Sequence, residues 1–502
     1  MTFADYSDVQ GIVRFGHARM TEACYFLVNV KSVASVRSWL TNAPITTAAA
    51  LNPPPKTALQ IAFTRQGLEA LRVQQEVIAG FSAEFIAGMA WDENRSRRLG
   101  DVDANSPSGW RWGNESVIPH AVVMLFAEPG LIDSWKASIQ GQPWHDAFQE
   151  IECLSTSDMG GREPFGFIDG ISQPVIDWDQ TREVPINGYE RKYSNLVSLG
   201  EFLLGYRNEY GKYTDRPLLD AQSPASSDLP FADDHPDKKD LGRNGTYVVM
   251  RQLAQDVRGF WQFIDRTADS NPEERYRLGS LMVGRTITDG SPLVPPSRET
   301  IPGVGTQHNG IQQNQFTYNS DPDGTRCPYG AHIRRANPRN PDIPGNPEGL
   351  ISTLIRTLGF GNKNLRDDLI ASTRFHRILR RGREYGRKLT PEEALQPVTA
   401  QDGERGLHFL AINSNIQRQF EFIQTAWLMR TKFDGMTEES DPLLGDRAPV
   451  LGCPLTNTFS VPQNGKLRER VMDIPQFVRV LGGAYFFLPG LRALQYFAKL
   501  RD

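Results

Sequence analysis

The sequence predicts a protein of alternating strands and helices in two parts. With 502 residues, the chain exceeds what a single hydrophobic core usually holds, so two domains or one duplicated unit are expected. In both halves, β-rich runs are followed by amphipathic helical patterns. Taken alone, this alternation favours a parallel α/β sheet, in which each helix returns the chain to the next strand.

The first half contains three predicted strands, at residues 23–30, 58–63 and 120–126. Thr64 follows the second strand and is a candidate N-cap for a helix that carries Leu68 and Leu71. The helix expected after the third strand begins near Pro129. Its apolar face consists of Leu131, Trp135 and Ile139.

A loop-rich stretch separates the two halves. Residues 213–243 contain four prolines, a pair of serines and many charged residues, which is typical of an exposed loop. We therefore predict an N-terminal domain at 1–212, a boundary loop at 213–243 and a C-terminal domain at 244–502.

The strand–helix pattern restarts after this stretch. A β-rich run at 246–250 precedes a helix with apolar residues at 257, 260, 261 and 264. A later run at 406–412 precedes a helix with apolar residues at 416, 420, 423 and 427. The recurrence of similar units suggests a duplication, although no residue-level repeat is visible.

The composition is that of an ordinary globular protein. Apolar residues make up 39% and charged residues 23% of the chain, which argues against global disorder. The net charge of -4 gives no electrostatic reason to expect nucleic acid or an anionic membrane as a partner. The longest apolar run, at 480–491, is too short to span a bilayer and is broken by glycines and a proline.

The four cysteines, Cys24, Cys153, Cys327 and Cys453, are far apart in the sequence. Without a C-x-x-C pair, zinc ribbons, thioredoxin-like motifs and covalent haem attachment through C-x-x-C-H are excluded. Free thiols in a reducing compartment are expected, while two disulfides remain an alternative. The N-terminus lacks the basic and apolar segments of a signal peptide, so a cytoplasmic location is expected.

Common enzyme motifs are missing. There is no H-E-x-x-H, G-x-S-x-G, Walker loop or G-x-G-x-x-G, so the zincin, α/β-hydrolase, P-loop and Rossmann interpretations have no support from motifs.

Three segments contain residues that could take part in catalysis or ligand binding, and the first covers residues 163–174. Here Gly166 and Gly170 lie on either side of Asp169. Glycines allow tight backbone geometry and let a bulky ligand approach closely. The competing interpretation is a plain Asp-Gly turn.

The second segment covers residues 326–339, in a loop expected at 292–345. His332 follows two small residues there, which suits a histidine that presents its ring to a large, flat ligand. A structural histidine is the alternative. Arg334, Arg335 and Arg339 could form a solvated basic face or hold anionic groups.

The third segment covers residues 374–386. In a strand, His376, Ile378 and Arg380 would share one face, and Arg377, Leu379 and Arg381 the other. The alternative is an arginine-rich edge strand that resists aggregation.

Together and in this order, the three segments resemble the motifs of the dye-decolorizing peroxidase family, a group of haem peroxidases. Further segments resemble landmarks of the same family, namely residues 8–13, 201–206, 282–285 and 418–424. The resemblance covers nearly the whole chain and is strongest to the larger, long-loop members.

The resemblance implies a role for individual residues. His332 would be the proximal iron ligand, Asp169 the distal acid-base group, and Arg380, rather than Arg381, the distal arginine. The residues expected around the cofactor are His332, Arg380, Gly166, Phe167, Ile168, Gly170, Arg334, Leu407 and Phe409. His308, also in the long loop, is the competing candidate for the iron ligand.

The resemblance also implies an α+β fold in place of the parallel sheet. It consists of two ferredoxin-like domains, each an antiparallel sheet with packed helices, and the haem lies in the C-terminal half. A single non-covalent haem b per chain is expected, in agreement with the missing C-x-x-C-H motif.

The implied activity is a haem-dependent peroxidase that reduces hydrogen peroxide and oxidises dyes, phenols or similar one-electron donors. The alternative is a haem storage, delivery or sensor protein with incidental peroxidase activity. Because the reference pKa of aspartate is about 3.9, against about 6.5 for histidine, an aspartate base predicts the fastest dye oxidation at acid pH.

Overall fold

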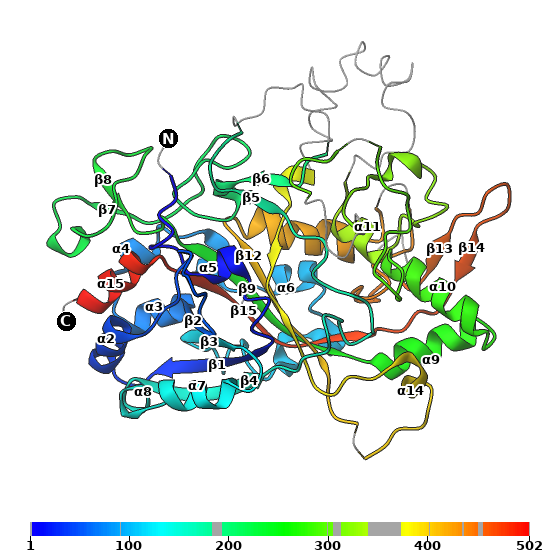
Figure 1. Cartoon of the computed structure of the whole chain (residues 1–502), viewed down its shortest axis with the longest axis horizontal. Coiled ribbons are helices and arrows are strands. Elements are labelled where there is room, and N and C mark those ends of the chain that lie inside the picture. The colour runs from blue at the N-terminus through cyan, green and yellow to red at the C-terminus, as the bar shows by residue number, and fades with distance from the viewer. Residues whose placement is uncertain are drawn as a thin grey trace, which may run out of the picture.

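The computed structural model describes residues 3–90, 92–182, 193–298, 300–304, 313–339, 373–400, 402–433, 436–449 and 455–500. Its centre is a nine-stranded sheet in the order β10-β12-β9-β15-β2-β3-β1-β4, with β11 also paired to β12 (Figure 1). The strands are β1 (Glu22–Val30), β2 (Thr57–Phe63), β3 (Ala121–Ala127), β4 (Phe148–Ser155), β9 (Thr246–Gln255), β10 (Leu379–Arg380), β11 (Arg383–Tyr385), β12 (Gly406–Asn413) and β15 (Val478–Leu488).

The sheet is antiparallel, so the parallel sheet suggested by strand–helix alternation is wrong. The reason is that both faces of the sheet are covered. All seven residues of β3 are buried, for example. A strand buried on both faces forms a continuous apolar run, which is the pattern usually associated with parallel sheets.

Each half of the sheet has the ferredoxin-like strand order, which confirms the α+β fold that the resemblance implied. Counted along the chain, the N-terminal strands lie in the order fourth, first, third, second (β4-β1-β3-β2). The C-terminal strands repeat this order as β15-β9-β12, followed by β10 and β11. The domain boundaries at 212 and 244 stay a prediction.

The two halves meet in two places, in the middle of the sheet and where its two ends come together. In the middle, β15 pairs with β2 through Phe487 and Phe63. At the outer ends, the His408 Nε2 atom of β12 lies 3.1 Å from the Ser155 carbonyl oxygen of β4, and the Ser157 N–H donates to the Glu384 carbonyl. The sheet therefore curls until its first and last strands touch.

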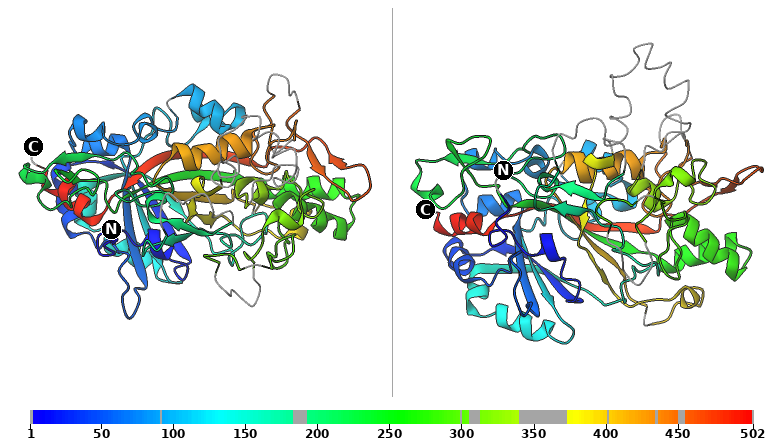
Figure 2. Two further views of the ribbon diagram at one scale, coloured as in Figure 1. Left: turned by 90° about the horizontal axis from the view of Figure 1, so that it is seen from above. Right: turned by 45° about the horizontal axis from the view of Figure 1, so that its top comes forward.

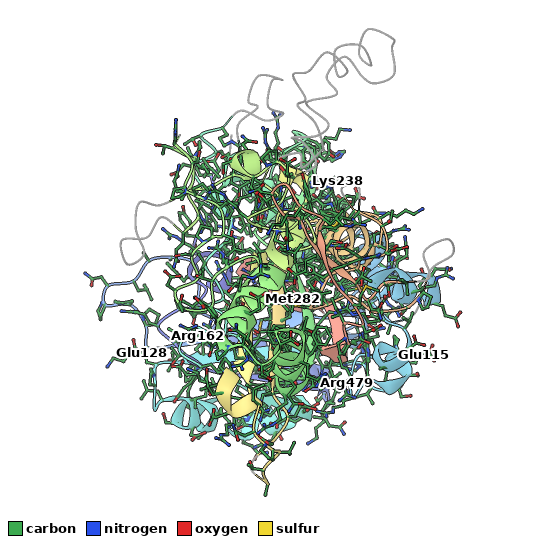
Figure 3. The ribbon with its side chains drawn as sticks, turned by 90° about the vertical axis from the view of Figure 1, so that its right-hand side faces the viewer. Glu115, Glu128, Arg162, Lys238, Met282 and Arg479 are labelled. Atoms are coloured by element: carbon green, nitrogen blue, oxygen red, sulfur yellow. The ribbon has the colours of Figure 1, made fainter. Side chains whose placement is uncertain are left out.

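Helices cover the outer face of this curled sheet, as two further views show (Figure 2). The longer ones are α2 (Val33–Asn42), α7 (Ile132–Ile139), α9 (Val257–Thr267), α10 (Pro272–Val283) and α15 (Leu491–Lys499). In the end-on view, Met282 of α10 lies near the centre, while Glu115 and Glu128 lie at the outline (Figure 3). The inner face packs on α1 (Ile12–Phe15) and on loop residues such as Phe202.

Shorter helices complete the described part of the chain. They are α3 (Arg65–Ala70), α4 (Gln75–Ile78), α5 (Ala83–Ala87), α6 (Glu93–Leu99), α8 (Gln142–Ala147), α11 (His332–Ala336) and α14 (Pro391–Ala394). The π-helical turns are η6 (Gln417–Glu421) and η7 (Ile423–Met429). Among the helices described, we find none with the length and apolarity needed to cross a membrane.

Most local predictions are confirmed. Thr64 caps α3 by accepting from the Gly67 N–H, and the apolar face predicted at 257–264 is the buried face of α9. The stretch at 213–243, however, is more than an exposed loop. It contains β7 (Leu218–Asp220) paired with β8 (Lys238–Asp240), and the buried Arg216 is ion-paired with Asp240.

Candidate active site

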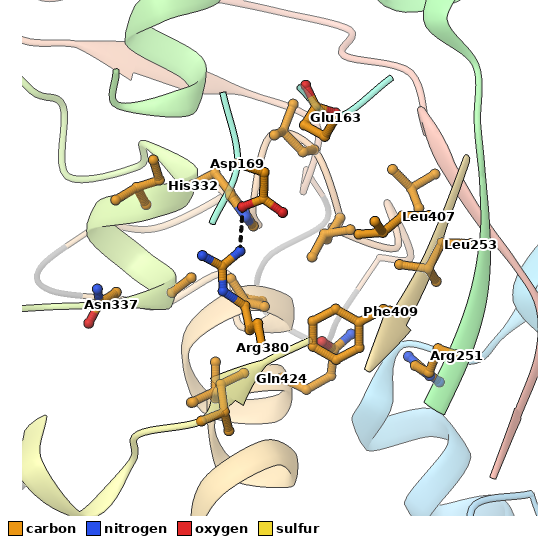
Figure 4. Close-up of a pocket in the computed structure, with 18 of the residues that line it drawn as sticks. Glu163, Asp169, Arg251, Leu253, His332, Asn337, Arg380, Leu407, Phe409 and Gln424 are labelled. Atoms are coloured by element: carbon orange, nitrogen blue, oxygen red, sulfur yellow. Dashed lines mark hydrogen bonds and ion pairs between the residues drawn. The ribbon is translucent and has the colours of Figure 1, made fainter. Parts of the chain in front are cut away.

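A cavity of about 240 Å³ lies between the sheet and the helices α10, α11, η6 and η7. Most of its lining comes from the C-terminal half of the chain, with contributions from residues 99–105 and from the loop after β4. Leu253, Leu407 and Phe409 form part of its apolar wall, on β9 and β12 (Figure 4). The side chains of Asp169, Arg380 and His332 converge at another part of the lining.

Asp169 lies on a tight loop closed by backbone hydrogen bonds. The Glu163 N–H donates to the Phe167 carbonyl, and the Asp169 N–H donates to the Gly161 carbonyl. Gly166 and Gly170 have φ values of +101° and +77°, which side chains rarely adopt, so the glycines on both sides of Asp169 shape the loop. Neither glycine lines the cavity itself.

Glu163 holds this loop from inside and was not predicted as a site residue. Its carboxylate accepts the N–H groups of Phe165 and Phe167 and the side-chain amide of Gln255, each at 3.0 Å. Burial raises the pKa of Glu163 to about 7, although these three donors act against the rise. Glu163 belongs to the segment that carries Asp169, but its contact with Gln255 could not be predicted because Gln255 comes from the distant strand β9.

Arg380 on β10 approaches Asp169 from the other half of the chain. Its Nη1 donates to the Asp169 Oδ1 at 2.7 Å, and its backbone N–H donates to the Gln173 side chain at 2.9 Å. The neighbouring Arg381 points elsewhere, with its guanidinium on the carbonyls of Ile12 and Val13. Of the two arginines, the structure therefore places Arg380 in the cavity.

Asp169 remains ionised down to acid pH in this arrangement. Burial alone would raise its pKa, but the Arg380 guanidinium and the Gly170 N–H outweigh burial and hold that pKa below its usual value. The side chains of Asp169 and Arg380 are 31% and 32% exposed, and both line the cavity. A small molecule in the cavity can therefore reach the carboxylate.

His332 is the first residue of α11, whereas the sequence suggested a loop. Gly330, two residues earlier, lies in a tight space, because a Cβ there would lie 3.1 Å from the ring of Phe459 and from the Glu439 carboxylate. The small residues before His332 thus serve close packing. His332 lines the cavity near enough to Asp169 and Arg380 to interact with their charges.

Asp441 orients the His332 ring, and sequence reasoning missed it. The His332 Nδ1 and the Asp441 Oδ2 are 2.9 Å apart, which leaves Nε2 as the ring nitrogen available to a metal. The other carboxylate oxygen of Asp441 accepts the N–H groups of Leu443 and Leu444 at 2.9 Å. Burial opposes a charged imidazole, but the Asp441 carboxylate outweighs it and raises the pKa of His332.

Of the other predicted residues, Phe167, Ile168, Leu407 and Phe409 line the cavity. Arg334 does not. It is fully buried in a separate network, where it bonds to Asp321 and to the Cys327 carbonyl and lies over the Tyr318 ring. The expectation that Arg334 binds the cofactor is therefore not supported by its position. His308 lies outside the described residues.

The arginines of the second segment form no solvated face. Arg335 is buried and donates to the carbonyls of Trp427, Arg430 and Glu439. Arg339 donates to the carbonyls of Asn314 and Phe316. These guanidinium groups hold loop backbones together around α11.

The cavity suits a flat, apolar cofactor that carries carboxylates and a metal. His332 offers a metal-ligating nitrogen, and the wall around it is mostly apolar. Arg285 and Arg377 also line the cavity, and within the described residues their hydrogen bonds go to uncharged groups: Arg285 donates to the Gly290 and Gln313 carbonyls and Arg377 to the Asn337 side chain. The Arg377 Nε has no hydrogen-bond partner there. A haem, with its apolar ring and two propionates, fits this donor set.

Comparison with known proteins gives consistent results. The chain is 28% identical to dye-decolorizing peroxidase msp1 of Mycetinis scorodonius, over 97% of this chain and 86% of that protein. It is 30% identical to a multifunctional dye peroxidase of Amycolatopsis sp., over 79% and 69% of the two chains. The fold matches that of a fungal DyP-type peroxidase from Auricularia auricula-judae with a TM-score of 0.70, at 24% identity, over 99% and 100% of the chains. No family model matches the chain.

Proposed function

The chain belongs to the dye-decolorizing peroxidase family, and we propose that Asp169, Arg380 and His332 are the residues with which it carries out the reaction of that family. It is a haem peroxidase, an oxidoreductase that reduces hydrogen peroxide and oxidises dyes and phenols. The observation that carries the proposal is that two hydrogen-bonded pairs of side chains meet at one cavity. The ion pair is Asp169 with Arg380 at 2.7 Å, and the second pair is the His332 imidazole with the Asp441 carboxylate at 2.9 Å, of which His332 lines the cavity.

Asp169 acts as the acid-base group. Cleavage of the peroxide bond needs one proton to leave the first oxygen and to reach the departing oxygen. A single carboxylate in reach of both oxygens can accept this proton and then donate it. The Oδ2 atom of Asp169 is suited to this transfer because, among the described residues, Arg380 and Gly170 both donate to Oδ1.

Arg380 stabilises the charge that develops as the peroxide bond breaks. Its guanidinium is fixed by Asp169 and by the Ser172 carbonyl, so it does not need to reorganise during the reaction. It also keeps Asp169 in the anionic form that can accept a proton.

His332 would hold the iron of the haem through Nε2, with Asp441 fixing the ring orientation. Arg377 and Arg285 would bind the propionates, and Leu407 and Phe409 would contact the ring. The chemistry that bound haem supplies is the storage of two oxidising equivalents, which are then returned one at a time to reducing substrates.

We propose that the cofactor is a non-covalent haem b, one per chain. Support comes from the missing C-x-x-C-H motif and from the cavity lining, since Cys24, Cys153 and Cys327 are not part of it. The cytoplasmic location expected from the N-terminal sequence stays a prediction.

The test compares peroxide-driven dye oxidation by the wild type, Asp169→Asn and Arg380→Leu at equal haem loading. We expect turnover to fall by roughly 10²- to 10⁴-fold in Asp169→Asn and by a comparable factor in Arg380→Leu. Arg381→Lys is the matched control and should keep wild-type turnover. If both variants of the pair keep full turnover, the storage, delivery or sensor function takes the place of this proposal.

A pH profile provides a second test. Because the pKa of Asp169 is lowered, the carboxylate loses its base function only at pH values below its usual range. Dye oxidation should therefore be fastest at acid pH, and an alkaline optimum for ordinary dyes would argue against Asp169.

A further inference from the structure

Two cysteines outside the cavity lie side by side on neighbouring strands. Cys24 is on β1 and Cys153 on β4, and the register pairs Cys24 with Ser155 and Cys153 with Phe26. The two thiols are therefore diagonal neighbours on the same face of the sheet. Each thiol is also the strongest influence on the pKa of the other, which agrees with this placement. Both cysteines are free thiols.

The two thiols differ in accessibility. Cys24 is only 1% exposed and belongs to the hydrophobic core, whereas Cys153 is half-buried on the last strand of the sheet order. The neighbouring Cys24 thiol lowers the pKa of the Cys153 thiol, and Lys136 on α7 and Ser155 act in the same direction, although burial opposes them. Cys153 therefore has the accessibility and thiolate character of a reactive cysteine, and Cys24 lies where a second thiol is needed.

We propose that Cys24 and Cys153 form a peroxide-responsive thiol pair, which closes to a disulfide when the enzyme meets its own oxidising substrate. The Cys153 thiolate attacks one oxygen of hydrogen peroxide, so an S–O bond forms and the O–O bond breaks, and the hydroxide that leaves takes up the proton that Cys153 had released, as water. The Cys24 sulfur then attacks the Cys153 sulfur, so an S–S bond forms and the S–O bond breaks. The departing hydroxide takes the Cys24 proton as water. Two thiols and one peroxide give one disulfide and two waters.

The position of the pair links it to the active site. After Cys153, β4 ends at Ser155, and the chain continues directly into the loop that carries Asp169. A bond from Cys153 to β1 would tie this end of the edge strand to the interior of the sheet. The pair would thus hold the Asp169 loop in place when peroxide is in excess.

Peptide mapping of the holoenzyme tests the proposal. The wild type is treated with hydrogen peroxide, free thiols are alkylated, and disulfide-linked peptides are identified before and after reduction. We expect a reducible Cys24–Cys153 link that is absent without peroxide, while the fully buried Cys327 stays a thiol. Unlinked Cys24 and Cys153 after treatment, at peroxide levels that sustain turnover, would overturn the proposal.

Variants separate this chemistry from the peroxidase reaction. In Cys24→Ser, Cys153 should be trapped as sulfenic acid by a dimedone-type reagent, because no resolving thiol is left. In Asp169→Asn, the link should still form although dye oxidation is lost. A link that forms in the wild type but not in Asp169→Asn would mean that the haem reaction oxidises the sulfurs, and the direct thiolate route would be wrong. The wild-type mapping decides the outcome even if Cys24→Ser fails to fold.

Discussion

Asp169 and Asp441 belong to two regions of the site and have contrasting surroundings. Asp169 lies on a glycine-shaped loop, is 31% exposed and pairs with one guanidinium. Asp441 has a side chain that is 0% exposed, and both of its oxygens are engaged, one by His332 and the other by two backbone N–H groups. The difference teaches that proton exchange requires a reachable carboxylate, whereas a fixed anion is best buried and fully hydrogen-bonded.

The largest effect is expected from removing His332, the residue that Asp441 orients. In His332→Ala, the cofactor loses its axial ligand, so we expect nearly complete loss of haem from the purified protein. Haem content per chain, measured after gel filtration, checks this. His145→Ala, an exposed change on α8, is the control and should keep full loading. Full retention by His332→Ala, with loss on changing His308 or His376 instead, would reassign the ligand.

Neutralising Asp441 should have a smaller effect than removing His332. Asp441→Asn keeps the size of the side chain but removes the charge that supports the imidazole, so we expect haem affinity or activity to fall about 10- to 100-fold. The loss of haem affinity is followed by the rate at which haem is transferred to an acceptor protein. Asp446→Asn, five residues along the chain, is the matched control. Equal transfer rates in the wild type and Asp441→Asn would show that the carboxylate does not support the ligand.

Changing the partner of Asp169 should shift the pH profile. In Arg380→Leu, the guanidinium that lowers the pKa of Asp169 is lost, so burial raises this pKa. The carboxylate then becomes protonated at higher pH, and the acid limb of the residual activity should move upward. In Arg380→Lys the positive charge is kept, so the acid limb should lie closer to its wild-type position than in Arg380→Leu. An acid limb that stays in place would mean that another group controls it.

The smallest effect is expected from Glu163, which holds the loop without entering the reaction. Glu163→Gln loses part of the acceptor capacity for Phe165, Phe167 and Gln255, so kcat should fall only a few-fold at unchanged haem loading. Glu115→Gln, at an exposed position, is the control. Unchanged kcat in Glu163→Gln would limit Glu163 to a structural role.

The raised pKa of Glu163 also leads us to expect that the stability of the protein changes with pH. Its pKa is raised to about 7 in the folded protein, so folding favours the protonated form. Its contribution to stability is present below its unfolded pKa of about 4.3 and is lost as pH rises through about 7. The Tm difference between the wild type and Glu163→Gln, measured across this range, should therefore change with pH. A difference that does not vary with pH would contradict the raised pKa.

The sequence was informative where chemistry is carried by one short segment. Asp169 lies between glycines in such a segment. The strand expected around Arg380 is shorter than predicted, because β10 is only Leu379–Arg380, and Arg377 of the opposite predicted face lines the cavity together with His376 and Ile378. The choice of Arg380 over Arg381 came from the resemblance and not from period-two alternation. Asp441 could not be found in this way. It lies 109 residues from His332. An aspartate without a motif gives no signal before the fold brings the two together.

The antiparallel direction of the strands could not be predicted from the alternation of strands and helices, for a different reason. Alternation of polar and apolar residues reveals an antiparallel sheet only when one face meets water. Here the helices cover one face and the curled sheet encloses the other, so residues such as Tyr25 and Phe26 are both buried. Arg334 was misplaced because a buried arginine that stacks on tyrosines and one that faces a cofactor look the same in sequence.

The position of β15 has a consequence for biosynthesis. The four N-terminal strands are neighbours in the sheet and can pair as soon as residue 155 has left the ribosome. The C-terminal strands cannot join the sheet through β2 until β15 is made, since β15 lies between β9 and β2. Val478 and Val480 of β15 also line the cavity. The lining of the pocket is therefore complete only when β15 has been translated.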